Sequence, residues 1–295
     1  MSRDAINNYI KKYAVYTKIG LKITGHHGYC VKDIDLIKNN KRFENIHKKQ
    51  RCFILGNGPS IKNENLEPLK NEIVFVVNQA TKNTFYDVVR PEYFVCVDPV
   101  FFNLDRKNKI EEQVIKSFEN LYHGGIAPVC FIPARFKNVF VGQEIAEKMD
   151  INCFVDSFKM TDTYNWEMDY SKVVPAFGTV VQYAITLAIY MGFEEIYLLG
   201  CDNTGILVTI NSILKNNMND MYSYSVGNEE KERMEKMVSI NGLEEYCKSY
   251  LYTLQDYRRL YEYCCKKNIK LVNCSSTTVL DSIPKTSLDS VIGTK

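Results

Sequence analysis

Short apolar runs that alternate with helical patterns constrain the fold of this chain more than any other feature of its sequence. From residue 51 onwards, these runs have the length of β-strands and contain few polar residues. Near-continuous apolar runs are typical of strands buried on both faces, as in a parallel sheet covered by helices. The runs are RCFILG (51–56), IVFVVN (73–78), YFVCVD (93–98), VCFIP (129–133), the weaker INCFVD (151–156), EIYLLG (195–200) and IKLVNC (269–274).

Helical patterns lie between several of these runs. Over 179–191, apolar residues recur at helical spacing, and Gly192 follows as a helix stop. A second pattern covers 251–267, is rich in Tyr and Leu, and ends in two lysines and an asparagine. This alternation of strands and helices predicts an α/β fold with a Rossmann-like, doubly wound and mostly parallel sheet.

The sequence divides into an N-terminal helical extension over 1–50 and a Rossmann-like nucleotide-binding catalytic domain over 51–295. The extension has an apolar helical face with lysines beside it, which either packs on the domain or rests on an anionic membrane surface. The segment at about 203–240 has little strand character and directly follows a predicted strand. Because ligands bind at the carboxyl ends of such strands, this segment is placed to act as a lid, and a surface loop is the alternative.

Composition and charge argue against several classes of protein. The formal net charge is only +2, which argues against a nucleic-acid partner. The ten cysteines include no CxxC pair, so a zinc ribbon is not expected, and those in apolar runs fit reduced, buried thiols of the cytosol. No signal peptide and no run of about 18 apolar residues is visible. We therefore expect a cytoplasmic protein, and peripheral association with the inner face of the membrane remains open.

The turn GNGPS at 56–60 follows the first predicted strand. Gly56 and Gly58 permit positive φ and close approach of a phosphate to the backbone. Pro59 can begin a helical turn whose N–H groups face an anion, and Asn57 supplies an amide that both donates and accepts. The turn lacks the Gly-Lys-Ser/Thr of a Walker A loop and the third glycine of the dinucleotide fingerprint. It predicts a nucleotide contact that includes Ser60, and a plain strand-to-helix turn is the alternative.

Polar residues also end the second and third predicted strands. Asn78 and Gln79 are adjacent amides that can bind a base, a ribose or a sugar, or can simply form a turn. Asp98 precedes Pro99, where a carboxylate can act as a base, bind a hydroxyl, ligate a metal or begin a turn. Because parallel strands end at one edge of a sheet, these side chains are expected to face the same ligand.

Two further features belong to this predicted edge. Gly178 and Thr179 open the helix at 179–191, where N–H groups and a hydroxyl can meet a phosphate, or where Thr179 is simply the N-cap. Asp202 lies shortly after Gly200, at the end of another predicted strand, a position suited to a carboxylate that binds a ribose or an acceptor.

These residues resemble two related families. GNGPS, the Asn-Gln pair, DPVFF and the stretch FGTVVQYAITLAIYMGFEEIYLLGCDN resemble the bacterial sialyltransferases of glycosyltransferase family 42, over the whole of 51–202. The opening NIHKKQRCFILGNGPS and the ending KLVNCSSTTVLDSIPKTSLDSVI resemble the DUF115 or MptE-like group. That group includes a 6-hydroxymethylpterin diphosphokinase, flagellin-modifying Maf proteins and many proteins of surface-polysaccharide clusters.

The resemblance implies a variant of the GT-A-like fold and a role for each strand end. It implies that the GNGPS turn lies at the nucleotide phosphate or ribose, that the two amides lie at the donor sugar, and that the aspartate of DPVFF lies at the reacting centre. It also implies that Gly178 and Thr179 lie against the cytidine side and that Asp202 lies near the nucleotide. The residues concerned are Gly56, Asn57, Gly58, Pro59, Ser60, Asn78, Gln79, Asp98, Gly178, Thr179, Gly200 and Asp202.

The resemblance also concerns the catalytic groups of the lid region. In family 42, tyrosines of the lid hold the departing phosphate and a histidine after the lid acts as general base. Tyr222 and Tyr224 match the tyrosine role, but no histidine follows His123 in this sequence. A carboxylate, Asp98 or Asp202, is therefore the expected general base.

The function expected from the sequence is a nucleotide-sugar-dependent glycosyltransferase of bacterial surface-polysaccharide (capsule or lipopolysaccharide) biosynthesis, with CMP-linked donors favoured. Its acceptor would be a glycan or a lipid-linked sugar, and no metal or other cofactor is expected. The first alternative is a diphosphokinase that transfers diphosphate from ATP, with Mg²⁺, to a pterin-like alcohol. The second alternative is a non-catalytic nucleotide-binding module.

Overall fold

The structure of this chain is a computed structural model. It describes residues 31–102, 110–122, 125–160, 162, 167–214, 223 and 228–293. The helix expected within residues 1–30 lies outside the described residues. The described part of the N-terminal extension is largely helical, with α3 (Val31–Ile37) and the 3₁₀ helix η2 (Lys38–Phe43).

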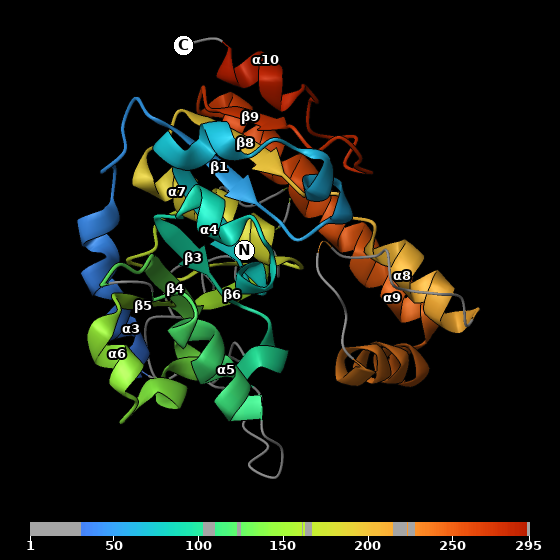
Figure 1. Ribbon diagram of the computed structural model, residues 1–295, viewed down its shortest axis with the longest axis horizontal. Helices are drawn as coiled ribbons and strands as arrows, with labels where there is room; N and C mark the ends of the chain where they lie inside the picture. The colour runs from blue at the N-terminus through green and yellow to red at the C-terminus, as the bar shows by residue number, and fades with distance from the viewer. Residues whose placement is uncertain are drawn as a thin grey trace, which may run out of the picture.

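Seven parallel strands form the central sheet, in the order β5-β4-β3-β2-β1-β8-β9 (Figure 1). All seven predicted runs form these strands, so the predicted parallel, doubly wound sheet is confirmed. A separate pair of parallel strands, β6 (Asp156–Lys159) and β7 (Val174–Ala176), has no counterpart in the prediction. The central strands are β1 (Arg51–Leu55), β2 (Ile73–Val77), β3 (Tyr93–Val95), β4 (Val129–Pro133), β5 (Ile151–Phe154), β8 (Glu195–Leu199) and β9 (Lys270–Asn273).

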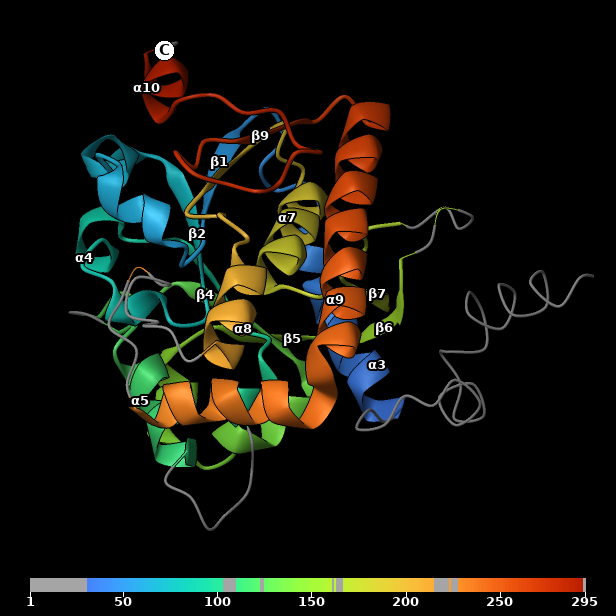
Figure 2. The same ribbon diagram turned by 90° about the vertical axis from the view of Figure 1, so that its right-hand side faces the viewer.

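Both faces of the sheet are buried, which explains why its strands are apolar at most positions. Phe53 and Leu55 of β1 pack into one hydrophobic cluster, whereas Cys52 and Ile54 pack into another. The first cluster includes residues of α4 (Tyr86–Val89), α5 (Ile110–Glu119), α6 (Glu144–Lys148) and α10 (Leu288–Ile292). The second cluster includes residues of α7 (Val180–Met191) and α9 (Asn228–Lys266), which lie side by side in Figure 2. The two layers of helices therefore sandwich one sheet.

Helix α7 confirms the helix predicted at 179–191. Thr179 is its N-cap and forms a capping box with Gln182, so two backbone N–H groups of the first turn have partners. At the other end, Gly192 has a φ of +88° and caps two carbonyls of the last turn. Ten of the twelve α7 residues are buried, because the helix lies between the sheet and α9.

The expectation of irregular structure over 203–240 is wrong for its described parts. Residues Gly205–Ile213 form α8, and residues from Asn228 onwards belong to α9. Helix α9 is two helices joined at Gly242, whose φ of 72° and ψ of 162° are accessible essentially to glycine alone. Figure 2 shows the two parts of α9 at a steep angle, with α8 beside them.

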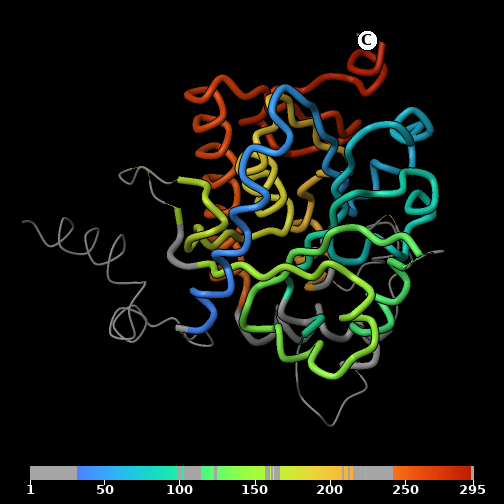
Figure 3. Tube along the Cα trace, turned by 90° about the vertical axis from the view of Figure 1, so that its left-hand side faces the viewer, coloured from blue at the N-terminus to red at the C-terminus, as the bar shows by residue number. Residues whose placement is uncertain are grey.

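The described part of the N-terminal extension packs on the Rossmann-like domain. The segment from α3 to β1, blue in Figure 3, runs along one side of the molecule. The side chain of Asn40 donates to the carbonyl oxygens of Cys153 and Tyr170, and Asn45 N donates to the carbonyl of Tyr190 in α7. Residues 31–50 therefore pack on the domain, and the choice between packing and membrane contact for the helical face within residues 1–30 stays a prediction. Within the described residues, no helix is long and apolar enough to span a membrane.

Candidate functional site

The strand order reverses between β1 and β8, which makes this the topological switch point of the sheet. From β1, the chain continues outward through β2 to β5, whereas β8 leads to β9 on the opposite side. Helices that leave neighbouring strands in opposite directions leave a crevice at the carboxyl ends, where ligands bind in open α/β sheets. The predicted GNGPS turn follows β1, and Gly200 and Asp202 follow β8. The candidate site is therefore this edge of the sheet.

The glycines of this edge serve the contact between the two turns. A Cβ added to Gly56 would lie 2.4 Å from the carbonyl oxygen of Gly200, and one added to Gly58 would lie 2.5 Å from Cγ of Asp202. The φ of Gly58 is −67°. Among the glycines at this edge of the sheet, only Gly200 has a φ in the left-handed region, at +59°. The expectation of positive φ at Gly56 and Gly58 is therefore wrong, because close approach of the chain to itself is what requires glycine here.

The N–H groups of the GNGPS turn are largely engaged within the chain. Gly56 N donates to the carbonyl of Leu199 and Gly58 N to the carbonyl of Gly200, each at 2.8 Å. Pro59 begins the 3₁₀ helix η3 (Pro59–Asn63) as predicted, but Ser60 N donates to Oδ2 of Asp202 at 2.8 Å. The expectation that this helical turn offers free N–H groups to an anion is therefore wrong for these three donors. A nucleotide contact of the turn through other atoms stays a prediction.

Asp202 holds the β1 turn to the β8 turn. Its carboxylate accepts from both the backbone N–H and the hydroxyl of Ser60, and the residue is only 2% exposed. Burial raises the pKa of Asp202, and the two bonds from Ser60 oppose that rise. A buried carboxylate with this bonding fixes the geometry of the edge, so it is placed as a positioning residue for the crevice.

Asparagines join the ends of β1, β2 and β3. Asn57 Nδ2 donates to the carbonyl of Val77 at 3.1 Å, and Asn57 Oδ1 accepts from Asn83 at 2.9 Å. Asn78 has a left-handed φ of 45°, and its Oδ1 accepts from Val97 N at 3.2 Å. Gln79 follows as the half-buried residue before the 3₁₀ helix η5 (Ala80–Lys82). Much of the predicted amide chemistry is thus used to hold the strand ends together.

Asp98 stands in a different environment from Asp202. It follows β3 and is half-buried, and its main-chain carbonyl accepts from Phe101 N at 3.0 Å. The 3₁₀ helix η6 (Pro99–Phe102) begins directly after it, so the predicted turn-initiating role is met. Because its side chain is partly accessible at the carboxyl end of a central strand, Asp98 is the better placed of the two predicted carboxylates to meet a substrate.

One described residue connects the predicted lid to the site. Both the backbone N–H and the hydroxyl of Ser223 donate to the carbonyl oxygen of Asn57, each at 3.1 Å. Ser223 lies between Tyr222 and Tyr224, which fall outside the described residues. The two bonds bring this point of the 203–240 segment to the GNGPS turn.

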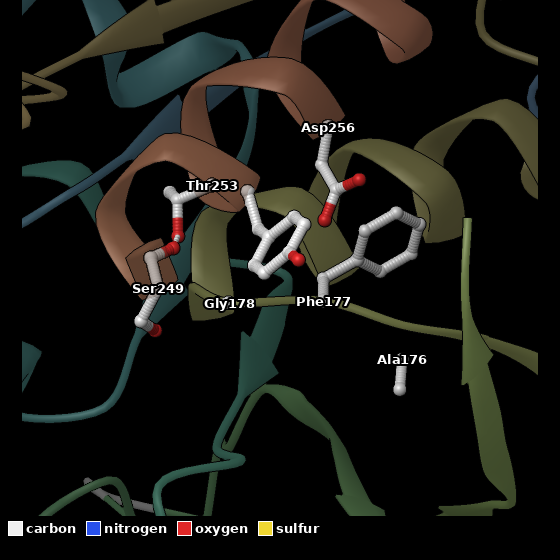
Figure 4. A pocket seen from close by; sticks show the side chains of 7 residues that line it. Ala176, Phe177, Gly178, Ser249, Thr253 and Asp256 are labelled. Atoms are coloured by element: carbon white, nitrogen blue, oxygen red, sulfur yellow. Dashed lines mark hydrogen bonds between the residues drawn. The ribbon is translucent and has the colours of Figure 1, made fainter. Parts of the chain in front are cut away.

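Gly178 and Thr179 lie between the edge and α9. The hydroxyl of Thr179 is 3.0 Å from the hydroxyl of Tyr257, and a Cβ on Gly178 would lie 2.3 Å from Oγ1 of Thr253. Gly178, which precedes α7, therefore packs directly against α9. A pocket of about 240 Å³ opens beside this contact, between residues 176–178 and α9 (Figure 4).

Two residues of the edge went unnoticed in the sequence. Asn203 has a left-handed φ of 54°, and among the described residues its Nδ2 is the buried side-chain atom that lacks a hydrogen-bond partner. Tyr250 of α9 donates to the carbonyl of Asn203 at 2.6 Å. A buried amide without a partner costs about 1–3 kcal/mol, so Asn203 Nδ2 is a candidate ligand donor. An asparagine after a strand-ending Gly-Cys-Asp was the available signal.

The described residues contain no group of three or more His, Cys, Asp or Glu side chains arranged to hold a metal ion. Among the predicted site residues, the structure brings Gly56, Gly58 and Ser60 into contact with Gly200 or Asp202, and brings Asn57 close to the second strand end.

The family model described as 6-hydroxymethylpterin diphosphokinase MptE-like matches residues 30–204, which is more than half of the chain. The chain therefore belongs to the MptE-like family, and the family predicted from the sequence is confirmed. No curated protein matches the chain.

Two solved structures are similar to this chain. The sialyltransferase CstII from Campylobacter jejuni, in complex with the substrate analogue cytidine-5'-monophosphate, is 16% identical, with a TM-score of 0.42; the match covers 81% of this chain and 86% of CstII. The MAf glycosyltransferase from Magnetospirillum magneticum AMB-1 is 12% identical, with a TM-score of 0.47, over 88% of this chain. This chain spans only 39% of the length of that second protein.

Proposed function

We propose that this protein is a glycosyltransferase that takes its sugar from a nucleotide-linked donor, with CMP-linked donors favoured, in bacterial surface-polysaccharide biosynthesis. The observation that carries the proposal is the pair of hydrogen bonds from Ser223 to Asn57, because it ties the predicted lid to the turn at the switch point. A lid that closes over the crevice can exclude water from a reactive glycosyl donor. The sequence resemblance to sialyltransferases supports the same reaction class.

The donor would bind along the edge formed by β1, β2 and β8. Asn203 Nδ2 is a buried donor that a ribose or phosphate oxygen can satisfy, and Asn57 and Asn78 hold the neighbouring strand ends in place. The N-terminus of the twelve-residue helix α7 follows Gly178 and carries the positive end of the helix dipole. We assign the nucleotide to this edge and the sugar to its β2–β3 side.

In the proposed reaction, the bond between the anomeric carbon of the donor sugar and its phosphate oxygen breaks as a bond forms to an acceptor hydroxyl. Asp98 takes the proton of that hydroxyl, and the nucleotide leaves with both electrons of the broken bond. The hydroxyls of Tyr222 and Tyr224 would stabilise the charge that develops on the leaving phosphate. Asp202 acts through Ser60 by holding the two turns together.

A thermal-shift comparison of CMP, CDP, UDP, GDP and ATP, each with and without Mg²⁺, tests the donor assignment. A ligand that binds only the folded protein raises the melting temperature by mass action. We expect CMP to stabilise the protein without Mg²⁺. If no cytidine nucleotide raises the melting temperature, the CMP-linked donor is refuted, and if none of the five nucleotides does so, a function that depends on any of them is refuted.

Substitutions test the catalytic roles. Asp98→Asn should lower transfer from the donor by about 100-fold or more, since general-base catalysis contributes about 10²–10⁴, while the CMP thermal shift stays as in the native protein. The double change Tyr222→Phe and Tyr224→Phe keeps the aromatic area and should lower turnover by about tenfold, which corresponds to about 1.4 kcal/mol. Full activity of Asp98→Asn would remove Asp98 as the base.

The second candidate function is a diphosphokinase, which is the activity named in the description of the matched family model. In this reaction, a diphosphate group moves from ATP to the hydroxyl of a pterin-like alcohol, with release of AMP and a requirement for Mg²⁺. Stabilisation by ATP only in the presence of Mg²⁺, together with AMP release that depends on 6-hydroxymethylpterin, would establish this function in place of glycosyl transfer.

A further inference from the structure

The pocket beside Gly178 has the composition of a binding site and lies outside the strand-end crevice. Its walls are residues 176–178 on one side and Ser249, Tyr252, Thr253 and Asp256 of α9 on the other. Figure 4 shows the aromatic ring of Phe177 and the carboxylate of Asp256 beside one space, which Tyr252 also lines. The pocket thus combines aromatic surface, hydroxyl groups and a carboxylate.

Both walls of the pocket are held by contacts with α7. Phe177 N donates to the hydroxyl of Tyr183 at 3.1 Å, and its ring meets the Tyr183 ring edge-on at 5.4 Å between centroids. Gln182, which is fully buried, donates to the carbonyl of Thr253 at 2.9 Å. These contacts tie both walls to α7, so the pocket is formed before any ligand arrives. Preformed sites bind with a smaller entropic cost.

The charge of the pocket favours a neutral ligand. Asp256 is 3% exposed, and Arg259 Nη1 lies 2.9 Å from its Oδ1. Because Arg259 already balances this carboxylate, a cationic ligand is not needed. An anionic ligand would meet the buried carboxylate directly and be repelled. A carboxylate has several lone-pair sites, so Asp256 can accept hydroxyl donors from a ligand in addition to the bond from Arg259.

The size of the pocket limits the ligand to about one ring. Its volume is about 240 Å³, whereas pockets for drug-sized ligands measure about 300–1,000 Å³. A whole nucleotide sugar does not fit in this space. A pyranose ring offers hydroxyls to a carboxylate and a face of C–H groups to aromatic rings, which interact through dispersion and weak C–H contacts.

We propose that this pocket binds one neutral sugar ring of the glycan acceptor, with Asp256 accepting sugar hydroxyls and Tyr252 packing against the C–H face. The identity of the sugar as an acceptor rests on the proposed glycosyltransferase function. The binding of a neutral sugar ring rests on the pocket alone.

The position of the pocket suits an acceptor subsite. Ser249 and Tyr252 flank Tyr250, whose hydroxyl bonds to Asn203 at the end of β8. On the opposite wall, Gly178 directly precedes Thr179, the N-cap of α7. The same turn of α9 therefore contacts the crevice through Tyr250 and lines the pocket through its neighbours. An acceptor with one sugar in the pocket can extend its next sugar towards the donor.

Saturation-transfer NMR with the full-length protein tests the proposal. The probes are the methyl glycosides of glucose, galactose, N-acetylglucosamine and N-acetylgalactosamine, with guanosine as a flat-ring comparison and tetramethylammonium as a cationic one. We expect at least one glycoside to bind. Tyr252→Ala should weaken its Kd by at least about tenfold, and Asp256→Asn should also weaken it. Leu251→Ala is the matched control, because Leu251 is 53% exposed on the same turn and does not line the pocket.

The outcomes separate the pocket from the donor site. Tyr252 is 46% exposed, so its replacement by alanine should leave the melting temperature and the CMP thermal shift unchanged. The proposal is overturned if no glycoside binds, if guanosine or tetramethylammonium binds in their place, or if Tyr252→Ala leaves glycoside binding unaltered. If CMP does not raise the melting temperature of the native protein, the CMP-donor assignment is refuted and the sugar-binding result still stands.

Discussion

Replacing Gly58 with alanine adds one methyl group at the point where the β1 and β8 turns meet. The new Cβ would lie 2.5 Å from Cγ of Asp202 and 2.6 Å from the carbonyl oxygen of Gly200. The carbonyl cannot retreat without loss of its 2.8 Å hydrogen bond from Gly58 N. The φ of Gly58 is −67°, which alanine adopts without strain, so backbone strain does not contribute to the effect.

The magnitude follows from three contributions. Overpacking a tight site costs about 1–3 kcal/mol, and a weakened backbone hydrogen bond adds about 1 kcal/mol. The stiffer unfolded chain offsets about 0.4–1 kcal/mol of this. We therefore expect Gly58→Ala to lower the free energy of unfolding by about 1–3.6 kcal/mol. At about 2–4 °C per kcal/mol for a domain of this order of size, the melting temperature should fall by at least about 2 °C.

Thermal and urea unfolding followed by circular dichroism measure this loss. Gly142→Ala is the comparison, because Gly142 has a φ of +75° and a Cβ there meets nothing within 4 Å, so it reports backbone strain alone. In an Asp202→Ala background, the added cost of Gly58→Ala should shrink, because only the contact with the Gly200 carbonyl remains. A Gly58→Ala protein that melts within 1 °C of the native one would refute the packing explanation.

Three further predictions concern ionisation and burial. Ser60→Ala and Asp202→Ala should each lower stability, and a double-mutant cycle by urea unfolding should give a coupling energy of about 1–3 kcal/mol; additive effects would contradict the contact. Burial lowers the pKa of His47 against the hydrogen bond to Gln50, so the unfolded chain binds this proton first as the pH falls. Stability should therefore decrease below about pH 6.5, and His47→Gln should make that decrease shallower in urea unfolding at pH 7.5, 6.5 and 5.5. Of the nine cysteines in the described part of the chain, seven are buried and only Cys247 and Cys265 are exposed. Iodoacetamide should therefore label these two before the seven buried thiols in the native protein, and all ten thiols of the chain after unfolding. Mass spectrometry measures the labelling.

The strands and the main helix were predictable from the sequence because burial leaves a local pattern. Strands covered on both faces are apolar at most positions, and all seven runs of this kind form the sheet. The capping threonine and the closing glycine of α7 are also local signals, since each acts within one turn of the helix. The helices α8 and the first part of α9 were missed, because asparagine, serine and charged residues are mixed with the apolar ones in this segment and obscure the helical period.

The site was predictable as a set of strand ends but not as a set of contacts. Parallel strands all end at one edge, so GNGPS, Asn78, Asp98 and Asp202 could be assigned to that edge from sequence alone. Which of them meet depends on the strand order, which places β8 beside β1 although more than 140 residues separate Ser60 from Asp202.

That order changes the chemical meaning of the same residues. Gly56 and Gly58, suited in isolation to a phosphate, are glycines because the β8 turn occupies the space of their side chains. The pocket of Tyr252 and Asp256 likewise exists only because α9 packs against the chain before α7. The sequence by itself determined the elements, since each reflects the burial of neighbouring residues. The tertiary structure decided the contacts, because strand order and helix packing join residues that no local pattern relates.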